Sequence, residues 1–285
     1  MKILVLGCSG LIGYNLCRWW AKNPDISLAG YSRTNEACCI ELASLGVDIY
    51  NHVCLFRAGS EMITGEGFDY VINCVGITKH DKSSSDLELL YGANVALPVF
   101  LAKLCKDEGA SFIQISTDCV FSGLRGGYTD LCIPDAPDDY GLSKALAESS
   151  LSAVSYVVRT STVGFHPYRR EGLFDWFVTN ESNSCDGFVN AVYSGLPTTS
   201  FADDLLNFMM INTGECRVLN MSGPTINKYE LLHLLNMEGN FKRAIVKKSV
   251  PVIDRTLQRS PTLHPFGGGS WEEMIRRELK SNGYI

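Results

Sequence analysis

The stretch KILVLGCSGLIG, residues 2–13, decides the fold. A short apolar run, Lys2–Leu6, leads into three glycines and then into a helical pattern, as in the first βαβ unit of a dinucleotide-binding domain. We expect Gly7 to permit a tight turn, Gly10 to let a pyrophosphate approach the backbone, and Gly13 to let the helix pack against the strand. The N-terminus of that helix would bind the phosphates. The predicted cofactor contacts in this loop are Gly7, Ser9, Gly10, Leu11, Ile12 and Gly13.

Short apolar runs and longer helical patterns alternate through the first half of the chain. Continuous apolar runs suit strands that are buried on both faces of a parallel sheet. The expected strands are Lys2–Leu6, Ile26–Tyr31, Val47–Tyr50, Tyr70–Val75, Phe112–Ile115 and Tyr156–Val158, and the expected helices are Leu11–Ala21, Leu87–Cys105 (with a kink at Pro98) and Tyr140–Leu151. This alternation predicts an α/β fold, a doubly wound parallel Rossmann sheet with right-handed crossovers.

The rhythm changes after residue 164, where an aromatic-rich stretch begins. The expected later elements are a helix over 201–210, a strand over 217–221, a helix over 228–235 capped by Asn227, and a final helix over 270–279 capped by Ser270. We predict a dinucleotide-binding domain over 1–164, to which 194–222 returns. Residues 165–193 and 223–285 would form a smaller, mixed C-terminal lobe that binds the substrate.

Composition narrows the function classes. The chain has 285 residues and a formal net charge of −6, which disfavours nucleic acid as a partner. Its N-terminus is too short in apolar residues for a signal peptide, and no stretch reads as a membrane span. The 11 cysteines form no C-x-x-C pair. We therefore expect reduced, space-filling thiols, no metal site, no membrane partner and a cytoplasmic location.

The end of the second strand indicates which dinucleotide binds. An NAD enzyme typically has an acidic residue there for the ribose hydroxyls, whereas this chain has Ser32 and Arg33. An arginine can pair bidentately with a 2′-phosphate, and a serine can donate to it. The pattern favours NADP (NADPH) and leaves NAD open, and a solvated surface arginine is the alternative for Arg33. Asn51, after the third strand, is a candidate contact to the adenine.

Three side chains form a candidate catalytic set. Thr117 ends the fifth strand, and Tyr140 and Lys144 lie four residues apart on one helix face. We expect the ammonium, together with a positive nicotinamide, to bring the phenol pKa toward neutrality. The threonine hydroxyl would hydrogen-bond the oxygen on which charge develops. Small residues after the fourth strand would let the cofactor lie across the strand ends: Cys74, Val75 and Gly76.

The whole pattern resembles an extended short-chain dehydrogenase/reductase, and most of all the dTDP-4-dehydrorhamnose reductase family. The stretch 116–123 is similar to that family's S-T-D-Y-V-F-x-G, with Cys119 where the family usually has Tyr. The other matching segments are Asn94-Val95-Ala96, Gly127-Tyr128, Tyr140-Gly141-x-Ser143-Lys144, Val158-Arg159-Thr160-Ser161, Gly195-Leu196-Pro197-Thr198 and the ending from Asp254 to Glu273.

The resemblance implies reduction of the 4-keto group of a nucleoside-diphosphate 4-keto-6-deoxyhexose, in the synthesis of deoxysugar or polysaccharide precursors. Tyr140 would protonate the C4 oxygen, and Lys144 would lower the pKa of Tyr140 and hold the nicotinamide ribose. Thr117 would orient the carbonyl, and Asp118 would support substrate placement or proton supply. The resemblance leaves a homodimer open. It completes the cofactor set with Asn94, Ser116, Thr160, Tyr140 and Lys144.

Two other functions compete with this interpretation. A sugar-nucleotide epimerase or dehydratase would return the hydride to the same molecule, but resembling dehydratases have Asp-Glu after the threonine, where this chain has Asp118 and Cys119. A non-catalytic NADP-binding regulatory subunit is the other.

For two groups of residues in the later part of the chain, the sequence allows two different roles. His166, Arg169 and Arg170 are either diphosphate contacts or a solvated loop. The aromatic residues Phe174, Trp176 and Phe177 either stack on a base or pack in the core or in a dimer contact.

Overall fold

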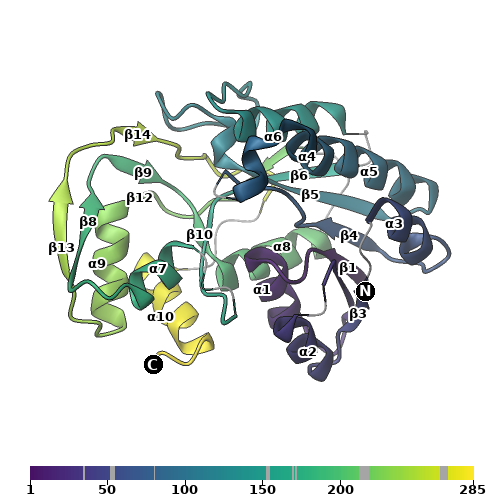
Figure 1. Ribbon diagram of the computed structural model, residues 1–285, viewed down its shortest axis with the longest axis horizontal. Helices are drawn as coiled ribbons and strands as arrows, with labels where there is room; N and C mark the ends of the chain where they lie inside the picture. Colours follow the sequence, from purple (N-terminus) through teal and green to yellow (C-terminus); the bar gives the residue numbers. More distant parts are fainter. Residues whose placement is uncertain are drawn as a thin grey trace. The chain divides into compact units, whose positions relative to one another are not determined.

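The computed structural model describes residues 1–34, 36–51, 55–79, 81–151, 155–168, 170, 172–211, 218–263 and 269–285 (Figure 1). The chain divides into two compact units that interleave along the sequence. The first unit comprises Met1–Phe121, Ile133–Arg159 and Thr213–Leu219, and the second comprises Ser122–Cys132, Thr160–Asn212 and Asn220–Ile285.

A seven-stranded sheet organises the first unit, in the order β11-β6-β5-β4-β1-β2-β3. Strand β1 pairs in parallel with both β2 and β4, so the strand order reverses on either side of β1. This confirms the predicted doubly wound α/β sheet. The strands are β1 (Lys2–Leu6), β2 (Ser27–Ser32), β3 (Asp48–Asn51), β4 (Tyr70–Asn73), β5 (Ser111–Thr117), β6 (Ser155–Thr160) and β11 (Val218–Asn220).

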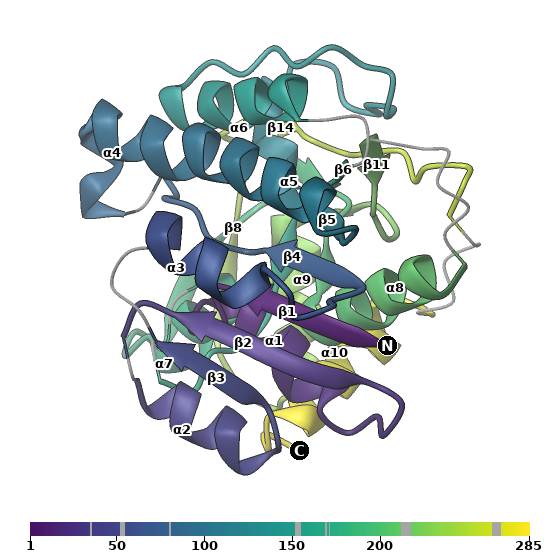
Figure 2. The ribbon, with the colours of Figure 1, turned by 90° about the vertical axis from the view of Figure 1, so that its right-hand side faces the viewer.

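Helices cover both faces of this sheet (Figure 2). On one face, Leu4 and Leu6 of β1 lie in a core cluster with Leu101 and Phe112. The alternate residue Val5 is equally buried toward the other face, which explains why the strands are continuously apolar. The helices are α1 (Leu11–Trp20) and α2 (Ala37–Ser44) on one side, and α3 (Leu55–Ile63), α5 (Leu97–Asp107) and α6 (Asp139–Ser150) on the other.

The helix expected over 87–105 is broken into pieces. The short helix α4 (Leu87–Tyr91) passes into a π-helical turn, η2 (Gly92–Ala96), before α5 begins. Pro98 lies in the first turn of α5, where its missing N–H leaves no helical hydrogen bond unmade. The proline therefore coincides with a helix start rather than a kink.

The same run corrects the expectation about membrane spans. Leu87–Asp107 has 21 residues and a hydropathy of 1.4, so its length and composition alone would suit a bilayer span. However, Leu101 and Cys105 are buried in the core of the first unit, and the core helix of a folded domain passes the same test.

In its described residues, the second unit is a mixed α/β body with three small sheets, ordered β10-β7, β12-β9-β14 and β13-β8. Its strands are β7 (Thr162–Val163), β8 (Ser184–Phe188), β9 (Ala191–Tyr193), β10 (Leu196–Pro197), β12 (Ile226–Asn227), β13 (Ala244–Lys248) and β14 (Ile253–Asp254). Its helices are α7 (Leu173–Thr179), α8 (Thr198–Ile211), α9 (Lys228–Glu238) and α10 (Trp271–Ser281).

Both predicted helix caps in this unit are confirmed. Asn227 Oδ1 accepts a 2.8 Å hydrogen bond from Glu230 N, and Ser270 forms a capping box with Glu273. Helix α10 also carries Glu278, a fully buried carboxylate. It accepts hydrogen bonds from Thr198 and Thr199 at the start of α8, and burial raises its pKa.

Some short segments of the chain group with a different unit from their neighbours in sequence. Residues Ser122–Cys132 belong to the second unit, where Tyr128 N donates to Thr256 O at 2.8 Å and Gln258 N donates to Tyr128 O at 2.8 Å. Helix α8 also groups with the second unit, while most of β11 belongs to the first. The predicted boundary at residue 164, with 194–222 returning, stays a prediction.

Candidate active site

The glycine loop begins with a turn that only glycine adopts readily. Gly7 has φ +82°, and its N–H donates to Tyr31 O at 2.9 Å, which fixes the loop to β2. At Gly13, a Cβ atom would overlap the carbonyl oxygen of Gly7. Close packing of α1 on the loop therefore requires glycine at this position, as expected from the sequence.

The N-terminus of α1 suits a bound diphosphate. Its N-cap, Gly10, offers no side-chain cap, and the first turn holds no acidic residue. The N–H groups of the first turn, which include those of Leu11 and Ile12, thus have no anionic side chain of their own helix as a partner. A Cβ on Gly10 would reach only ordinary contact, 3.5 Å from Gly7 O. The loop residues therefore fit the pyrophosphate of a dinucleotide.

A hydroxyl pair and a cation lie at the end of β2. Ser32 Oγ donates to Ser9 Oγ at 2.9 Å, and both side chains are buried. The next residue, Arg33, is exposed, and Asn51 is the β3 register partner of Ser32. The residues predicted to contact a 2′-phosphate and the adenine thus lie on neighbouring strand ends.

The end of β4 lies against the glycine loop. A Cβ on Gly7 would contact the backbones of Cys74 and Val75 at 3.2 and 3.1 Å. Gly76 approaches Asn94, whose amide donates to Ile77 O and to Ser143 Oγ, each at 3.0 Å, and accepts from Ile77 N at 2.8 Å. The Asn94 side chain therefore braces this loop and α6, and its predicted cofactor contact stays a prediction.

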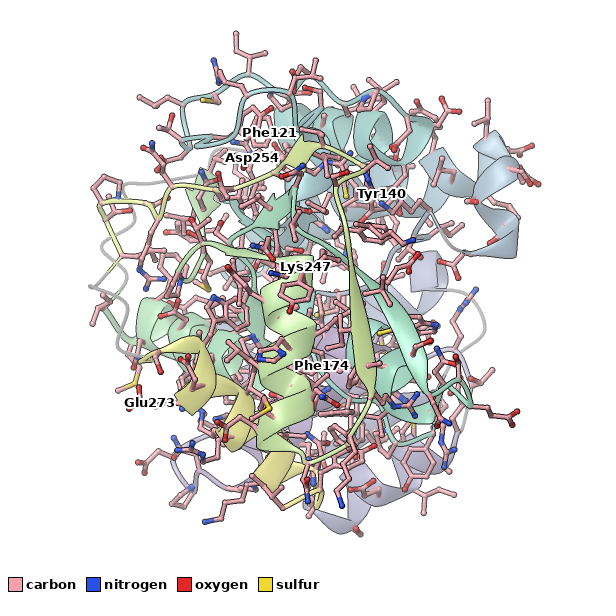
Figure 3. All side chains as sticks on the ribbon, turned by 90° about the vertical axis from the view of Figure 1, so that its left-hand side faces the viewer. Phe121, Tyr140, Phe174, Lys247, Asp254 and Glu273 are labelled. Atoms are coloured by element: carbon pink, nitrogen blue, oxygen red, sulfur yellow. The ribbon has the colours of Figure 1, made fainter. Side chains whose placement is uncertain are left out.

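The structure brings the predicted Thr117, Asp118 and Tyr140 together within the first unit. Tyr140 projects from the first turn of α6, which Asp138 caps by accepting from Gly141 N at 2.8 Å (Figure 3). The Thr117 hydroxyl lies close enough to the Tyr140 phenol to lower its pKa, and Thr117 Oγ1 donates to Asp118 Oδ1 at 3.2 Å. A hydroxyl and a phenol at one place can both contact one substrate oxygen.

The phenol of Tyr140 is not acidified by the chain alone. Burial raises its pKa, the charges of Cys119, Asp118 and Asp138 add to the rise, and only the Thr117 hydroxyl opposes it. In the chain without cofactor, Lys144 therefore does not lower the pKa of Tyr140 as the sequence predicted. The physical reason is the direction of the lysine, whose ammonium is bound elsewhere.

Lys144 is buried and donates from Nζ to Ile115 O of β5 at 2.7 Å. Burial lowers its pKa to about 8, while the charges of Glu148 and Cys74 favour the ammonium. The lysine is therefore close to titration in the neutral range, where a small change in nearby charge alters its protonation.

Sequence reasoning missed an ion pair beside this set. Glu148, one turn after Lys144 on α6, pairs with Arg159 of β6, and both side chains are 4% exposed. The Glu148 carboxylate also accepts from Ser116 Oγ at 2.5 Å, so the hydroxyl predicted to bind cofactor is used within the protein. An arginine in the apolar strand SYVVRT was a signal, since a buried cation needs a buried partner.

Three of the later residues with two interpretations, Phe174, Phe177 and His166, are buried. Phe174 and Phe177 are buried, which confirms packing for them, whereas Trp176 is 44% exposed. His166 is also buried, and Tyr168 N donates to its Nδ1 at 3.3 Å. Its buried position argues against the solvated-loop interpretation.

Three further predicted residues have separate outcomes. Arg170 is exposed, and Arg169 lies outside the described residues. Thr160 ends β6 and is buried, and within the described parts of the chain its hydroxyl has no hydrogen-bond partner. Its predicted role in cofactor binding stays a prediction.

The sheet, the glycine loop and the Thr–Tyr–Lys set define the class of extended short-chain dehydrogenases/reductases. A family model described as RmlD substrate binding domain matches residues 1–236. The chain belongs to this family.

Individual relatives agree with the assignment. A dTDP-4-dehydrorhamnose reductase of Mycolicibacterium smegmatis is 31% identical over 153 residues, which is 50% of this chain and 44% of the relative. The spore coat polysaccharide biosynthesis protein SpsK of Bacillus subtilis is 30% identical over 172 residues, 58% of this chain and 54% of the relative. The matches thus span about half the length of these relatives.

Solved structures show the same fold over almost the whole chain. A dTDP-4-dehydrorhamnose reductase of Clostridium acetobutylicum has a TM-score of 0.78 at 17% identity, covering 99% of this chain and 100% of its own. A UDP-glucuronic acid 4-epimerase of Bacillus cereus has a TM-score of 0.79 at 18% identity and covers 98% of both chains.

Proposed function

We propose that this chain is an NADPH-dependent reductase of the 4-keto group of a nucleoside-diphosphate 4-keto-6-deoxyhexose. The single observation that carries the proposal is that Thr117 and Tyr140 lie close together, one helical turn before the buried Lys144, on a fold with an uncapped glycine-loop helix. We also propose that the sugar nucleotide is its partner in a cytoplasmic pathway to deoxysugar or polysaccharide precursors. The named activities of the relatives support this choice of substrate.

The residues proposed to hold the dinucleotide lie along one edge of the sheet. Gly7, Gly10 and the first turn of α1 would bind its diphosphate, and Ser32 with Arg33 its 2′-phosphate. The reduced nicotinamide, when bound, supplies hydride to the carbonyl carbon. The fit rests on the open α1 N-terminus and on the absence of an acidic residue at the end of β2.

Side chains of the protein supply the proton that the carbonyl oxygen takes up. Tyr140 donates its phenolic proton to the carbonyl oxygen as negative charge develops there, because a phenol with a raised pKa is protonated at neutral pH. Thr117 holds the same oxygen by a second hydrogen bond. Lys144, whose ammonium donates to Ile115 O in the chain alone, is proposed to hold the nicotinamide ribose, as the family resemblance implies.

Turnover with a panel of substrates tests the proposal. The purified chain is expected to oxidise NADPH when it is given nucleoside-diphosphate 4-keto-6-deoxysugars, with one sugar reduced per cofactor. Cofactor that stays tightly bound without net oxidation would favour the epimerase or dehydratase alternative. Binding of NADP without turnover of any sugar in the panel would favour a regulatory subunit, and either result would overturn the reductase.

Arg33 is expected to decide the preference for NADPH over NADH. Replacing Arg33 by Ala removes the cation for the 2′-phosphate, so NADPH affinity should fall by roughly tenfold, equivalent to about 1.4 kcal/mol, while NADH affinity changes little. Fluorescence titration with each cofactor measures both constants. Lys22→Ala, a substitution of another cation of the first unit, serves as the control. Equal losses for both cofactors would contradict the assignment of Arg33.

A further inference from the structure

We propose that the buried Glu148–Arg159 ion pair positions the predicted catalytic residues and sets the charge that faces Lys144. The inference rests on the proposed function, because it gives the pair its role through Lys144 and Tyr140. Neither member of the pair is proposed to touch substrate or cofactor.

The pair joins three elements of the first unit. Arg159 on β6 donates from Nη2 and Nε to Glu148 Oε2 of α6 at 2.7 and 3.0 Å. Ser116, at the end of β5, donates to the other carboxylate oxygen at 2.5 Å. Arg159 also lies over the ring of Phe121, 5.0 Å from its centroid. The strand end that carries Thr117 is thereby tied to α6.

Helix periodicity places the carboxylate in line with the predicted catalytic side chains. Tyr140, Lys144 and Glu148 follow one another at intervals of four residues, so they lie on one face of α6. A tilt or rotation of the helix at Glu148 would therefore move Tyr140 relative to Thr117.

Stability alone gives little reason for such a pair. Removing two charges from water costs about as much as their attraction returns, and apolar side chains of similar size often serve as well. A fully hydrogen-bonded buried pair does, however, hold its elements in one arrangement and imposes a fixed local charge. Both the fixed arrangement and the fixed charge should affect the neighbouring Lys144.

The charges around Lys144 come from several elements. Glu148 faces it from its own helix, the thiol of Cys74 lies at the end of β4, and the carbonyl of Ile115 on β5 accepts a hydrogen bond from its ammonium. Arg159, from β6, is the ion-pair partner of Glu148, so on this proposal it is the countercharge to that carboxylate. The groups around Tyr140 are Cys119, Asp118 and Asp138, all of which disfavour the phenolate.

Because Glu148 and Arg159 carry opposite charges, removing one or the other should shift the pKa of Lys144 in opposite directions. Without the carboxylate, the cation of Arg159 is left near Lys144 and the ammonium is lost at a lower pH. Without the guanidinium, the carboxylate acts unopposed and the ammonium persists to a higher pH. The alkaline limb of kcat/KM, which we assign to loss of the Lys144 ammonium, should move in the same sense.

The test measures the titration of Lys144 directly and the pH profile beside it. In protein labelled with 15N-lysine, the Lys144 Nζ signal, assigned by its loss in Lys144→Arg, is expected to titrate near pH 8. Glu148→Gln should lower this midpoint, and Arg159→Gln should raise it, each by about one pH unit. The double variant Glu148→Gln/Arg159→Gln should return toward the native value. Asp107→Asn, which breaks the exposed pair with Lys103, should leave it unchanged.

A purely structural pair would give a different result. If both single variants retain the fold by circular dichroism, midpoints that move together or not at all would overturn the proposal. Should a single variant fail to fold, Ser116→Ala is the milder change, because it removes one hydrogen bond and leaves both charges. The freer carboxylate should raise the midpoint and lower kcat, and unchanged values of both would again overturn the proposal.

This titration requires neither sugar nor cofactor. Its failure in a chain that reduces 4-keto sugars would remove only the role of the ion pair. Failure of the turnover assay, with the opposite titration shifts present, would instead remove the proposed reaction.

Discussion

Tyr140→Phe is expected to lower kcat by roughly 10³-fold, because it removes the group that we propose as proton donor at the developing oxyanion. The ring remains, so α6 and its Asp138 cap keep their packing. NADPH affinity and the midpoint of thermal unfolding should therefore stay near those of the native chain. Stopped-flow measurement of NADPH oxidation, with a saturating 4-keto sugar nucleotide, separates the loss in kcat from any change in KM.

Tyr70→Phe is the matched control for this loss. It removes a phenolic hydroxyl at the opposite end of the strand from Asn73, where β4 begins, so it should leave kcat unchanged. Activity retained in Tyr140→Phe would contradict the assigned proton donor. A loss of similar size in both variants would point to a general effect on the fold.

Gly13→Ala is expected to cause the largest loss of stability among single methyl additions in the loop. The added Cβ would overlap Gly7 O and press on the backbone of Cys8, neither of which can move as a flexible side chain would. The free energy of unfolding should fall by about 2–3 kcal/mol, and NADPH affinity should fall with it. Urea denaturation and cofactor titration measure the two effects.

Gly10→Ala separates folding from binding at the same loop. Its Cβ meets only Gly7 O at 3.5 Å, and its φ of −92° suits any residue, so stability should remain native. The methyl group would stand where the diphosphate approaches, so NADPH should bind more weakly. Native affinity in Gly10→Ala would mean that the diphosphate does not cross this residue, and a native Gly13→Ala would refute the close packing.

The sequence predicted correctly those helices and strands whose bounds are set by neighbouring residues. Strand β1 has the expected bounds, because a glycine turn ends its apolar run. The break before α5 was not predicted, since a π-helical turn over Gly92–Ala96 leaves no mark in the spacing of apolar residues. The parallel pair β8–β13 joins segments about 60 residues apart, from Ser184 and Ala244 onward, and periodicity contains no information on such a partner.

The candidate site divides in the same way. The motif spacing brought Thr117, Tyr140 and Lys144 to one place, because strand ends and helix phase follow from the sequence. The pKa of the phenol did not follow, because its direction depends on burial and on where Lys144 Nζ points. Glu148 and Arg159 likewise become partners only when α6 packs against β6.

The edge strand β11 of the large sheet has a consequence for synthesis of the chain. β11 pairs beside β6 but arises from Val218–Asn220, nearly 60 residues further along. Until the ribosome has released that segment, β6 presents an unpaired edge of backbone N–H and C=O groups. The nascent protein is thus exposed to intermolecular strand pairing late in translation, when most of the nucleotide-binding half has already emerged.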